Sequence, residues 1–244
     1  MTVATADSPT WLLLPGTPLS AAVWDGARAE LSETGHVITP EIAPPAGYMG
    51  ADLQAQLAAD IAESAAPDAP WHVVGHSFGG QVALELAIAR PDLVSRLTLL
   101  CTRDTPFPAF DAAAAAIEAG AVDVDGTFRR WFSPAEVRDD GPVVRYARDA
   151  VTSADRASWA SALRAIAHFD CSPRTASITC PVTVVAAELD TVSDVASMES
   201  MHRRIPDSEF IVRAGAQHMS IFDDAVTLAQ ILLGEQRDAT QRPR

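Results

Sequence analysis

The segment from Val73 to Ala87, V-V-G-H-S-F-G-G-Q-V-A-L-E-L-A, constrains the fold of this chain more than any other. It starts with an apolar run typical of a buried strand and ends with a run that favours a helix. Ser77 stands between the two, with glycines close by that let a strand and a helix approach each other. The pattern predicts a strand, a tight turn and a helix, with the Ser77 hydroxyl presented at the turn.

The same alternation of apolar runs and amphipathic stretches extends along much of the 244 residues. It is typical of a parallel sheet that is covered by helices on both faces. We expect an α/β fold with six strands, all parallel, in which the strand over His36–Ile42 lies at an edge. Only ten residues precede Trp11, too few for an additional N-terminal hairpin that packs on the sheet.

The strand pattern stops after Arg103 and returns only at Pro181–Ala187. The residues between carry helical patterns, including one predicted helix over Pro134–Val151. We therefore expect a helical cap of residues 104–177, inserted into a core domain made of residues 1–103 and 178–244.

The formal net charge is −14, and all 18 basic residues are arginines. Phosphate backbones repel such a surface, so nucleic acids and anionic membranes are poor candidate partners. The chain contains no lysine, which excludes Schiff-base chemistry and a lysine phosphate loop. The first ten residues contain no basic residue and no apolar core of a signal peptide, so we expect a cytoplasmic protein.

The three cysteines and six histidines are widely spaced. An odd number of distant cysteines indicates neither a disulfide framework nor a zinc motif. We expect buried thiols, no bound metal and no cofactor.

Three residue types needed for nucleophilic catalysis each follow a predicted strand. Ser77 lies in the motif Gly75-His76-Ser77-Phe78-Gly79, Asp190 follows the Pro181–Ala187 strand, and His218 follows the last strand. A serine hydroxyl needs a base, and the imidazole base needs a carboxylate that orients it. The order Ser, Asp, His is the order expected for a serine hydrolase with a nucleophile elbow. We therefore predict Ser77, Asp190 and His218 as the catalytic triad.

With these residues the chain resembles the α/β-hydrolase superfamily over nearly its whole length. The segment from Leu12 to Thr17, L-L-L-P-G-T, is similar to the oxyanion loop of that family, with a proline where the family has a histidine. The resemblance implies that the backbone N–H groups of Thr17 and Phe78 form an oxyanion hole.

The expected cap resembles that of 3-oxoadipate enol-lactone hydrolases and related small carboxylesterases. The similar segments are G-T-F-R-R-W-F-S-P, from Gly126 to Pro134, and W-A-S-A-L-R, from Trp159 to Arg164. By this resemblance, Trp131 lines the substrate pocket. The substrate is then a small ester or lactone, cleaved through an acyl-enzyme.

The balance of charge adds an expectation about the substrate. Between Arg103 and Arg174 there are nine arginines and eleven carboxylates, so this part is close to neutral while the remainder is strongly acidic. An anionic substrate could be received there, with Arg129 and Arg130 as binding residues beside Trp131. The alternative is that both arginines pair with nearby aspartates on a solvated face.

Other interpretations stay open. Asp104 could replace Asp190 as the acid, whereas Glu188, His76 and His168 suit structural roles better than catalytic ones. The same fold also supports a C–C bond hydrolase or lyase, and a ligand-binding protein without catalysis. Turnover that depends on Ser77 separates the last of these from an enzyme.

Overall fold

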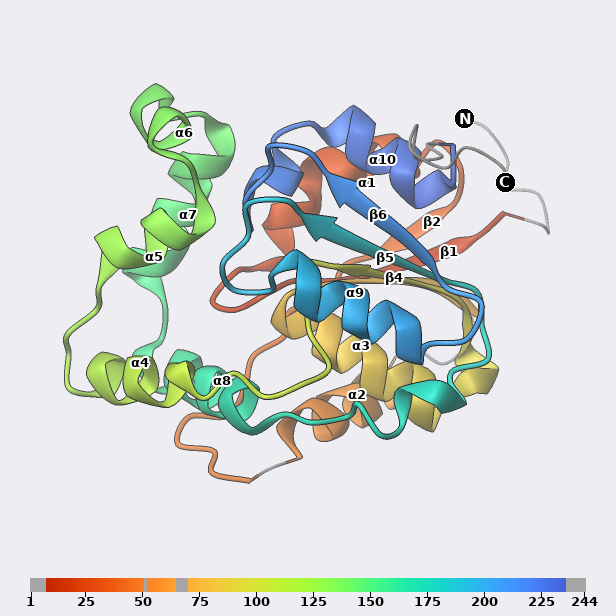
Figure 1. The fold of residues 1–244 in the computed structure, drawn as a ribbon, viewed down its shortest axis with the longest axis horizontal. Coiled ribbons are helices and arrows are strands. Elements are labelled where there is room, and N and C mark those ends of the chain that lie inside the picture. The colour runs from red at the N-terminus through yellow and green to blue at the C-terminus, as the bar shows by residue number, and fades with distance from the viewer. Residues whose placement is uncertain (1–7, 51, 65–69, 236–244) are drawn as a thin grey trace.

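The computed structural model describes residues 8–50, 52–64 and 70–235 (Figure 1). At its centre lies a six-stranded sheet with the strand order β2-β1-β3-β4-β5-β6, and every neighbouring pair is parallel. The strands are β1 (Thr10–Leu14), β2 (His36–Ile38), β3 (Trp71–His76), β4 (Val94–Leu100), β5 (Val182–Ala187) and β6 (Glu209–Arg213). The expected α/β architecture with six parallel strands is therefore confirmed. Residues 1–7, which bear on the expected absence of an N-terminal hairpin, lie outside the described residues.

Helices cover the sheet on both faces (Figure 1). On one face α1 packs against α10, and on the other α3 and α9 pack on the strands, with α2 against α3. Their bounds are α1 (Asp25–Leu31), α2 (Leu53–Ser64), α3 (Phe78–Ala89), α9 (Val195–Arg204) and α10 (Ala225–Leu233). This two-sided cover explains why the central strands read as continuous apolar runs.

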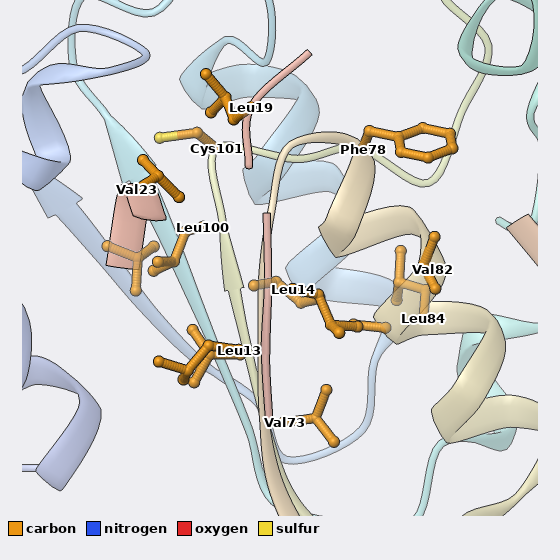
Figure 2. Close-up of a cluster of buried hydrophobic side chains, with 14 of the residues drawn as sticks. Leu13, Leu14, Leu19, Val23, Val73, Phe78, Val82, Leu84, Leu100 and Cys101 are labelled. Atoms are coloured by element: carbon orange, nitrogen blue, oxygen red, sulfur yellow. The ribbon is translucent and has the colours of Figure 1, made fainter. Parts of the chain in front are cut away.

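The main core lies between the central strands and these helices. Figure 2 shows buried side chains from β1, β3 and β4 together with others from α3. Leu13, Leu14 and Leu100 have no exposed surface, and α3 is buried along most of its length. The ends of these strands are thereby held rigidly, which matters because the candidate site is built there.

β2 is shorter than expected. The sequence pattern predicts a strand over His36–Ile42, but the ladder to β1 ends at Ile38. Its place at the edge of the sheet is as expected. Pro40 lacks a backbone N–H and interrupts a ladder that has a partner on one side only, which explains the early end.

Five α-helices and a short 3₁₀ helix, Thr175–Ser177, connect β4 to β5. Residues 104–177, all of which the structure describes, contain no strand. We call this segment the helical insertion; that it acts as a cap stays a prediction. Figure 1 shows α6 at its far end, away from the sheet. The helices are α4 (Ala109–Glu118), α5 (Val124–Trp131), α6 (Pro134–Asp139), α7 (Pro142–Ser153) and α8 (Arg156–His168).

The prediction of a single helix over Pro134–Val151 is wrong, because α6 and α7 are separate helices. Asp140 adopts a left-handed conformation with φ 46°, and Gly141 and Pro142 follow it. A proline inside a helix removes a hydrogen bond and clashes with the preceding turn, so the helix ends and a new one starts at Pro142.

None of the helices in the described part of the chain is both long and apolar enough to cross a membrane. The cytoplasmic location stays a prediction from the sequence.

Candidate active site

Ser77 occupies the turn between β3 and α3. Its backbone has φ 52° and ψ −118°, a conformation that costs energy for a residue with a side chain. The turn is held by backbone contacts: Ser77 N donates to Leu100 O at 3.0 Å, and Thr102 Oγ1 donates to Ser77 O at 2.7 Å. The strained turn expected from the sequence is therefore present, and it presents the Ser77 side chain at the carboxyl end of the sheet.

Two glycines make this turn possible. A Cβ atom on Gly75 would lie 2.5 Å from Gly79 O, and one on Gly79 would lie 2.4 Å from both Leu14 O and Pro15 O. These are contacts with backbone, which cannot move aside as a side chain can. Strand β3, helix α3 and the segment after β1 thus approach each other as closely as glycine allows.

His218 and Asp190 come together at the ends of neighbouring strands, after β6 and β5. The His218 Nδ1 atom lies 2.7 Å from Asp190 Oδ2, and both residues are almost completely buried. The other carboxylate oxygen, Asp190 Oδ1, accepts from Val192 N at 2.7 Å and from Ser193 N at 3.1 Å. The carboxylate therefore orients the imidazole and leaves its Nε2 atom available for another partner.

The electrostatics keep Asp190 ionised. Burial on its own would raise the pKa of Asp190, but the charge of His218 and the hydrogen bonds from His218, Val192 and Ser193 outweigh it and lower the pKa. The Cys101 thiol lies close to this carboxylate. Burial, and then the negative charge of Asp190, raise the pKa of Cys101, so its thiol stays protonated.

Two aromatic side chains flank His218. The ring of Trp131, from the insertion, stacks on the imidazole with 6.5 Å between ring centroids, and Trp131 O accepts from Met219 N at 3.1 Å. On another side, His76 Nε2 donates to His218 O at 3.1 Å. Burial, and then the neighbouring His218, lower the pKa of His76 to about 3, so this ring is neutral. Its structural role stays a prediction.

A cavity of about 80 Å³ contacts both Ser77 and His218. It lies between the sheet's carboxyl end and the insertion, and its wall is mainly apolar. Its polar residues beyond the pair are few: Thr17, Asp123, Thr127 and Arg130. The apolar wall comes from α4, α5, α8 and the segment after β5: Phe110, Ala113, Ala116, Ile117, Ala121, Trp131, Trp159, Leu163, Ile166 and Val192. Concave, mostly apolar sites with a few placed polar groups are typical of small-molecule binding.

Arg129 and Arg130 are neighbours in the sequence but have different surroundings in the structure. Arg130 lines the cavity, whereas Arg129 is exposed and is not among the lining residues. Arg130 Nη2 donates to Thr127 Oγ1 at 3.1 Å, and Asp123 acts on it only through its charge. Among the described residues no carboxylate forms an ion pair with Arg130, so most of its donors are not engaged by the protein.

Thr17 lies on the wall of the cavity, and Gly16 brings its loop against Ser77. A Cβ atom on Gly16 would lie 2.8 Å from His76 Nδ1 and 3.1 Å from Ser77 Cβ. Phe78 is buried and borders a much smaller cavity, of about 10 Å³, that also touches Ser77 and Arg103. Both residues expected to form the oxyanion hole are therefore adjacent to Ser77.

The remaining candidates lie apart from the imidazole ring. Asp104 is buried and pairs through both carboxylate oxygens with Arg204, with distances of 2.6 and 2.9 Å. Glu188 accepts from Gly215 N at 2.7 Å and supports the loop that leads to His218. His168 is exposed and lies 3.1 Å from Asp111 Oδ2.

Sequence reasoning missed Cys101 and Arg103, which follow β4 and stand close to Asp190. No motif marks them; their place at the end of a predicted strand was the only signal. In the described part of the chain, ligand atoms of His76, Cys101 and His218 lie within 4.8 Å of one another, a set that could hold a metal ion. The set shares His218 with the candidate triad, and the Nδ1 atom of that residue is already paired with Asp190; the expected absence of a metal stays a prediction.

Known proteins resemble this chain in sequence and in fold. A family model described as the alpha/beta hydrolase family matches residues 11–231. 3-Oxoadipate enol-lactonase 1 of Acinetobacter baylyi is 29% identical over 171 residues, which are 67% of this chain and 62% of that protein. The match thus spans less than two thirds of that relative. RutD of Variovorax paradoxus, named as a carbamate hydrolase, is 30% identical over 205 residues, with 76% of this chain and 75% of that protein covered.

Solved structures share the fold. The enol-lactonase from Burkholderia xenovorans LB400 superposes with a TM-score of 0.85 at 20% identity, covering 94% of this chain and 91% of that one. A thermophilic esterase from Thermogutta terrifontis gives a TM-score of 0.83 at 24% identity, with coverages of 95% and 90%. At these identities the likeness concerns the fold, and it confirms the architecture expected from the sequence.

Proposed function

Because this chain belongs to the alpha/beta hydrolase family, we propose that it is a serine hydrolase that cleaves a small ester or lactone through an acyl-enzyme. The observation that carries the proposal is the hydrogen bond of 2.7 Å between His218 Nδ1 and Asp190 Oδ2, beside a cavity that Ser77 and His218 both line. A buried carboxylate–imidazole pair next to a strained serine is the arrangement that activates a hydroxyl nucleophile.

In the proposed mechanism, His218 Nε2 takes the proton of Ser77 Oγ as the oxygen attacks the substrate carbonyl. Asp190 stabilises the imidazolium that forms and fixes the tautomer of the ring. The imidazolium then protonates the leaving oxygen, and an acyl group remains on Ser77. A water molecule, deprotonated by His218, attacks this ester, and the acid product leaves.

We assign the oxyanion hole to the backbone N–H groups of Thr17 and Phe78. The close approach of Gly16 to Ser77 supports Thr17, and the position of Phe78 at the start of α3 supports the second donor. Positive charge concentrates at a helix N-terminus and favours the negative oxygen that develops there. Donors of this kind hold the oxyanion without any asparagine, a residue that the chain does not contain.

The size of the cavity favours a small acyl group. An engineered cavity of about 150 Å³ accommodates benzene, whereas the space beside Ser77 is about 80 Å³. The wall is apolar along α4 and α8, so the group in contact with it is apolar as well. We therefore propose short acyl chains or a small lactone ring as the part that binds there.

We further propose that Arg130 receives a carboxylate of the substrate. It is half-buried, lines the same cavity as Ser77 and has one hydrogen bond, to Thr127. A guanidinium with unused donors in a partly apolar site binds a carboxylate through two parallel hydrogen bonds. Arg129 has no part in this proposal, because it is exposed and does not line the cavity.

The proposal is tested with a panel of short-chain aryl esters, small lactones and carbamates. Wild type should release the alcohol or phenol in an initial burst equal to the enzyme concentration when deacylation is slow. Ser77→Ala should show neither burst nor turnover. Turnover of esters that is unaffected in Ser77→Ala would refute the serine mechanism. The absence of both burst and turnover across the panel would favour the C–C bond hydrolase, lyase or non-catalytic alternatives.

A second comparison tests the substrate charge. A lactone or ester that carries a carboxylate should give a higher kcat/KM than its methyl-capped analogue. Equal values for the two substrates would leave a general carboxylesterase as the better description.

A further inference from the structure

The carboxylate of Asp190 depends on a short segment of backbone, residues 190–193, which we call the acid turn. Asp190 Oδ1 accepts hydrogen bonds from Val192 N and Ser193 N, at 2.7 and 3.1 Å. These two donors set the plane of the carboxylate, so the Oδ2 atom points at His218 only if the turn keeps its shape. No helix or strand includes the acid turn. Its shape must therefore come from contacts with other parts of the protein.

Arg103 supplies one such contact. Its Nη1 atom donates to Val192 O at 3.3 Å, on the same residue whose N–H holds Asp190. Arg103 is half-buried, and burial lowers its pKa, while the charges of Asp194, Asp104 and Asp190 raise it. The guanidinium is thus a half-buried cation that contacts the acid turn and lies near several carboxylates.

The same side chain reaches the start of the insertion. Nη2 of Arg103 donates to Thr105 Oγ1 at 3.3 Å, and the guanidinium lies over the ring of Phe107, 4.8 Å from its centroid. The carbonyl of Arg103 accepts from Gln81 Nε2 of α3, at 3.3 Å. One residue therefore connects α3, the first residues of the insertion and the acid turn.

We propose that Arg103 is a positioning residue: it ties the base of the insertion to the acid turn and, through Val192, keeps Asp190 aligned with His218. Without the guanidinium, Val192 O would be an unpaired acceptor and the turn could rotate its two N–H groups away from the carboxylate. Arg103 borders the cavity of about 10 Å³ beside Ser77 but not the larger cavity that Ser77 and His218 both line. We therefore expect it to act on turnover rather than on binding of a substrate in the larger cavity. The inference rests on the proposed triad.

A double-mutant cycle between Arg103 and Asp190 tests this role, with kcat and KM measured on an activated short-chain aryl ester. Arg103→Met should lower kcat about 10–100-fold, the loss found when a group that orients a metal ligand is removed, and should leave KM within about twofold of wild type. In an Asp190→Asn background, the same change should lower kcat by less than about threefold, because the alignment is already lost.

Arg174→Met is the matched control. Arg174 pairs with the buried Glu85 near the other end of the insertion and contacts no residue of the acid turn among those described. It should lower the melting temperature at least as much as Arg103→Met and leave kcat within about twofold of wild type. If Arg103→Met does not fold, Arg103→Lys, which keeps the charge but cannot contact Val192 and Thr105 together, replaces it in the cycle.

The possible results are distinct. Additive losses in the double variant, or a rise in KM with kcat unchanged, would overturn the role of Arg103. A loss of kcat in Arg174→Met as large as in Arg103→Met would also overturn it, because the effect would then be one of stability. Wild-type kcat in Asp190→Asn alone would refute the proposed acid itself.

Discussion

Helices α3 and α6 are built in opposite ways. All but the last two residues of α3 are buried, and its first turn is held by backbone contacts with β1, β3 and β4. Helix α6 has no buried residue and is held by its own capping box, in which Ser133 and Glu136 exchange hydrogen bonds. Helix α3 begins directly after Ser77, and α6 lies at the far end of the insertion (Figure 1).

This difference between α3 and α6 indicates that the core and the helical insertion contribute differently to the site. The core places Ser77 through backbone that cannot move without breaking buried contacts, so the reacting groups are held rigidly. The insertion approaches the site mainly through side chains, such as Trp131 and Arg130, which can change without disturbing the sheet. We therefore expect changes in the core to abolish chemistry or folding, and changes in the insertion to alter substrate choice.

The largest effect should follow from the acid. Asp190→Asn should lower kcat about 10⁴-fold, because the imidazole loses its counter-charge and its tautomer. Asp104→Asn should lower kcat by less than about tenfold, since Asp104 meets Arg204 and not His218. Steady-state kinetics on one activated ester give both values. A reversed order would assign the acid to Asp104.

The next largest effect should be on the stability of the fold, when a glycine is replaced by alanine. Gly79→Ala should lower the free energy of unfolding by about 1–3 kcal/mol, because its methyl group would overlap Leu14 O and Pro15 O. Gly141→Ala, in the insertion, should change stability by less than about 0.5 kcal/mol, as no atom lies within 4 Å of its new Cβ atom. Denaturant unfolding measures both; equal losses would remove the contrast between the two regions.

Substrate choice should depend on one of two adjacent arginines. Arg130→Gln should lower kcat/KM for a carboxylate-bearing ester about 10–100-fold, the value of a lost charge-assisted hydrogen bond, and leave its methyl-capped analogue nearly unchanged. Arg129→Gln is the control and should change neither rate by more than about twofold, because its side chain is exposed. Equal effects of the two variants would place the carboxylate elsewhere.

The smallest effect concerns the contact between the two regions. Asp223, after the 3₁₀ helix Ser220–Phe222, contacts Glu136 of α6. Burial, and then the hydrogen bond with Glu136, raise the pKa of Asp223 from 3.8 to about 6. The folded protein therefore binds this proton more tightly than the unfolded chain. The resulting stability is full below about pH 4 and is lost as the pH rises through about 6.

Asp223→Asn removes this dependence, since the amide stays neutral. The variant should melt about 1–3 °C above wild type at pH 7–8 and at the same temperature near pH 4. Burial would raise the pKa of Glu136, but hydrogen bonds with Ser133 and Ser220 outweigh it and lower the pKa from 4.5, so its own titration moves away from that of Asp223. Thermal melts from pH 4 to 8 test the prediction, and a constant difference across that range would contradict it.

The sheet and the position of the candidate triad could be predicted because both depend on local patterns. Apolar runs bounded by turn residues indicated all six strands, and parallel strands bring their carboxyl ends to one edge of the sheet. Ser77, Asp190 and His218 each follow a strand, so the structure brings them to the same edge; their catalytic roles stay predictions. In the sequence, Gly141-Pro142 marks the break between α6 and α7, but the helical pattern on either side favours one continuous helix.

What only the tertiary structure decided is which side chains meet. Arg129 and Arg130 are neighbours in sequence, but successive residues of a helix point about 100° apart, and packing of α5 put only Arg130 on the cavity. Arg103 reaches Val192 across 89 positions of chain, a contact that no local pattern indicates. By itself, the sequence determined the order of strands and helices and where polar residues interrupt them, because periodicity is a local property of the chain. Partners distant in sequence depend on how the helices pack, and packing is decided by the whole fold.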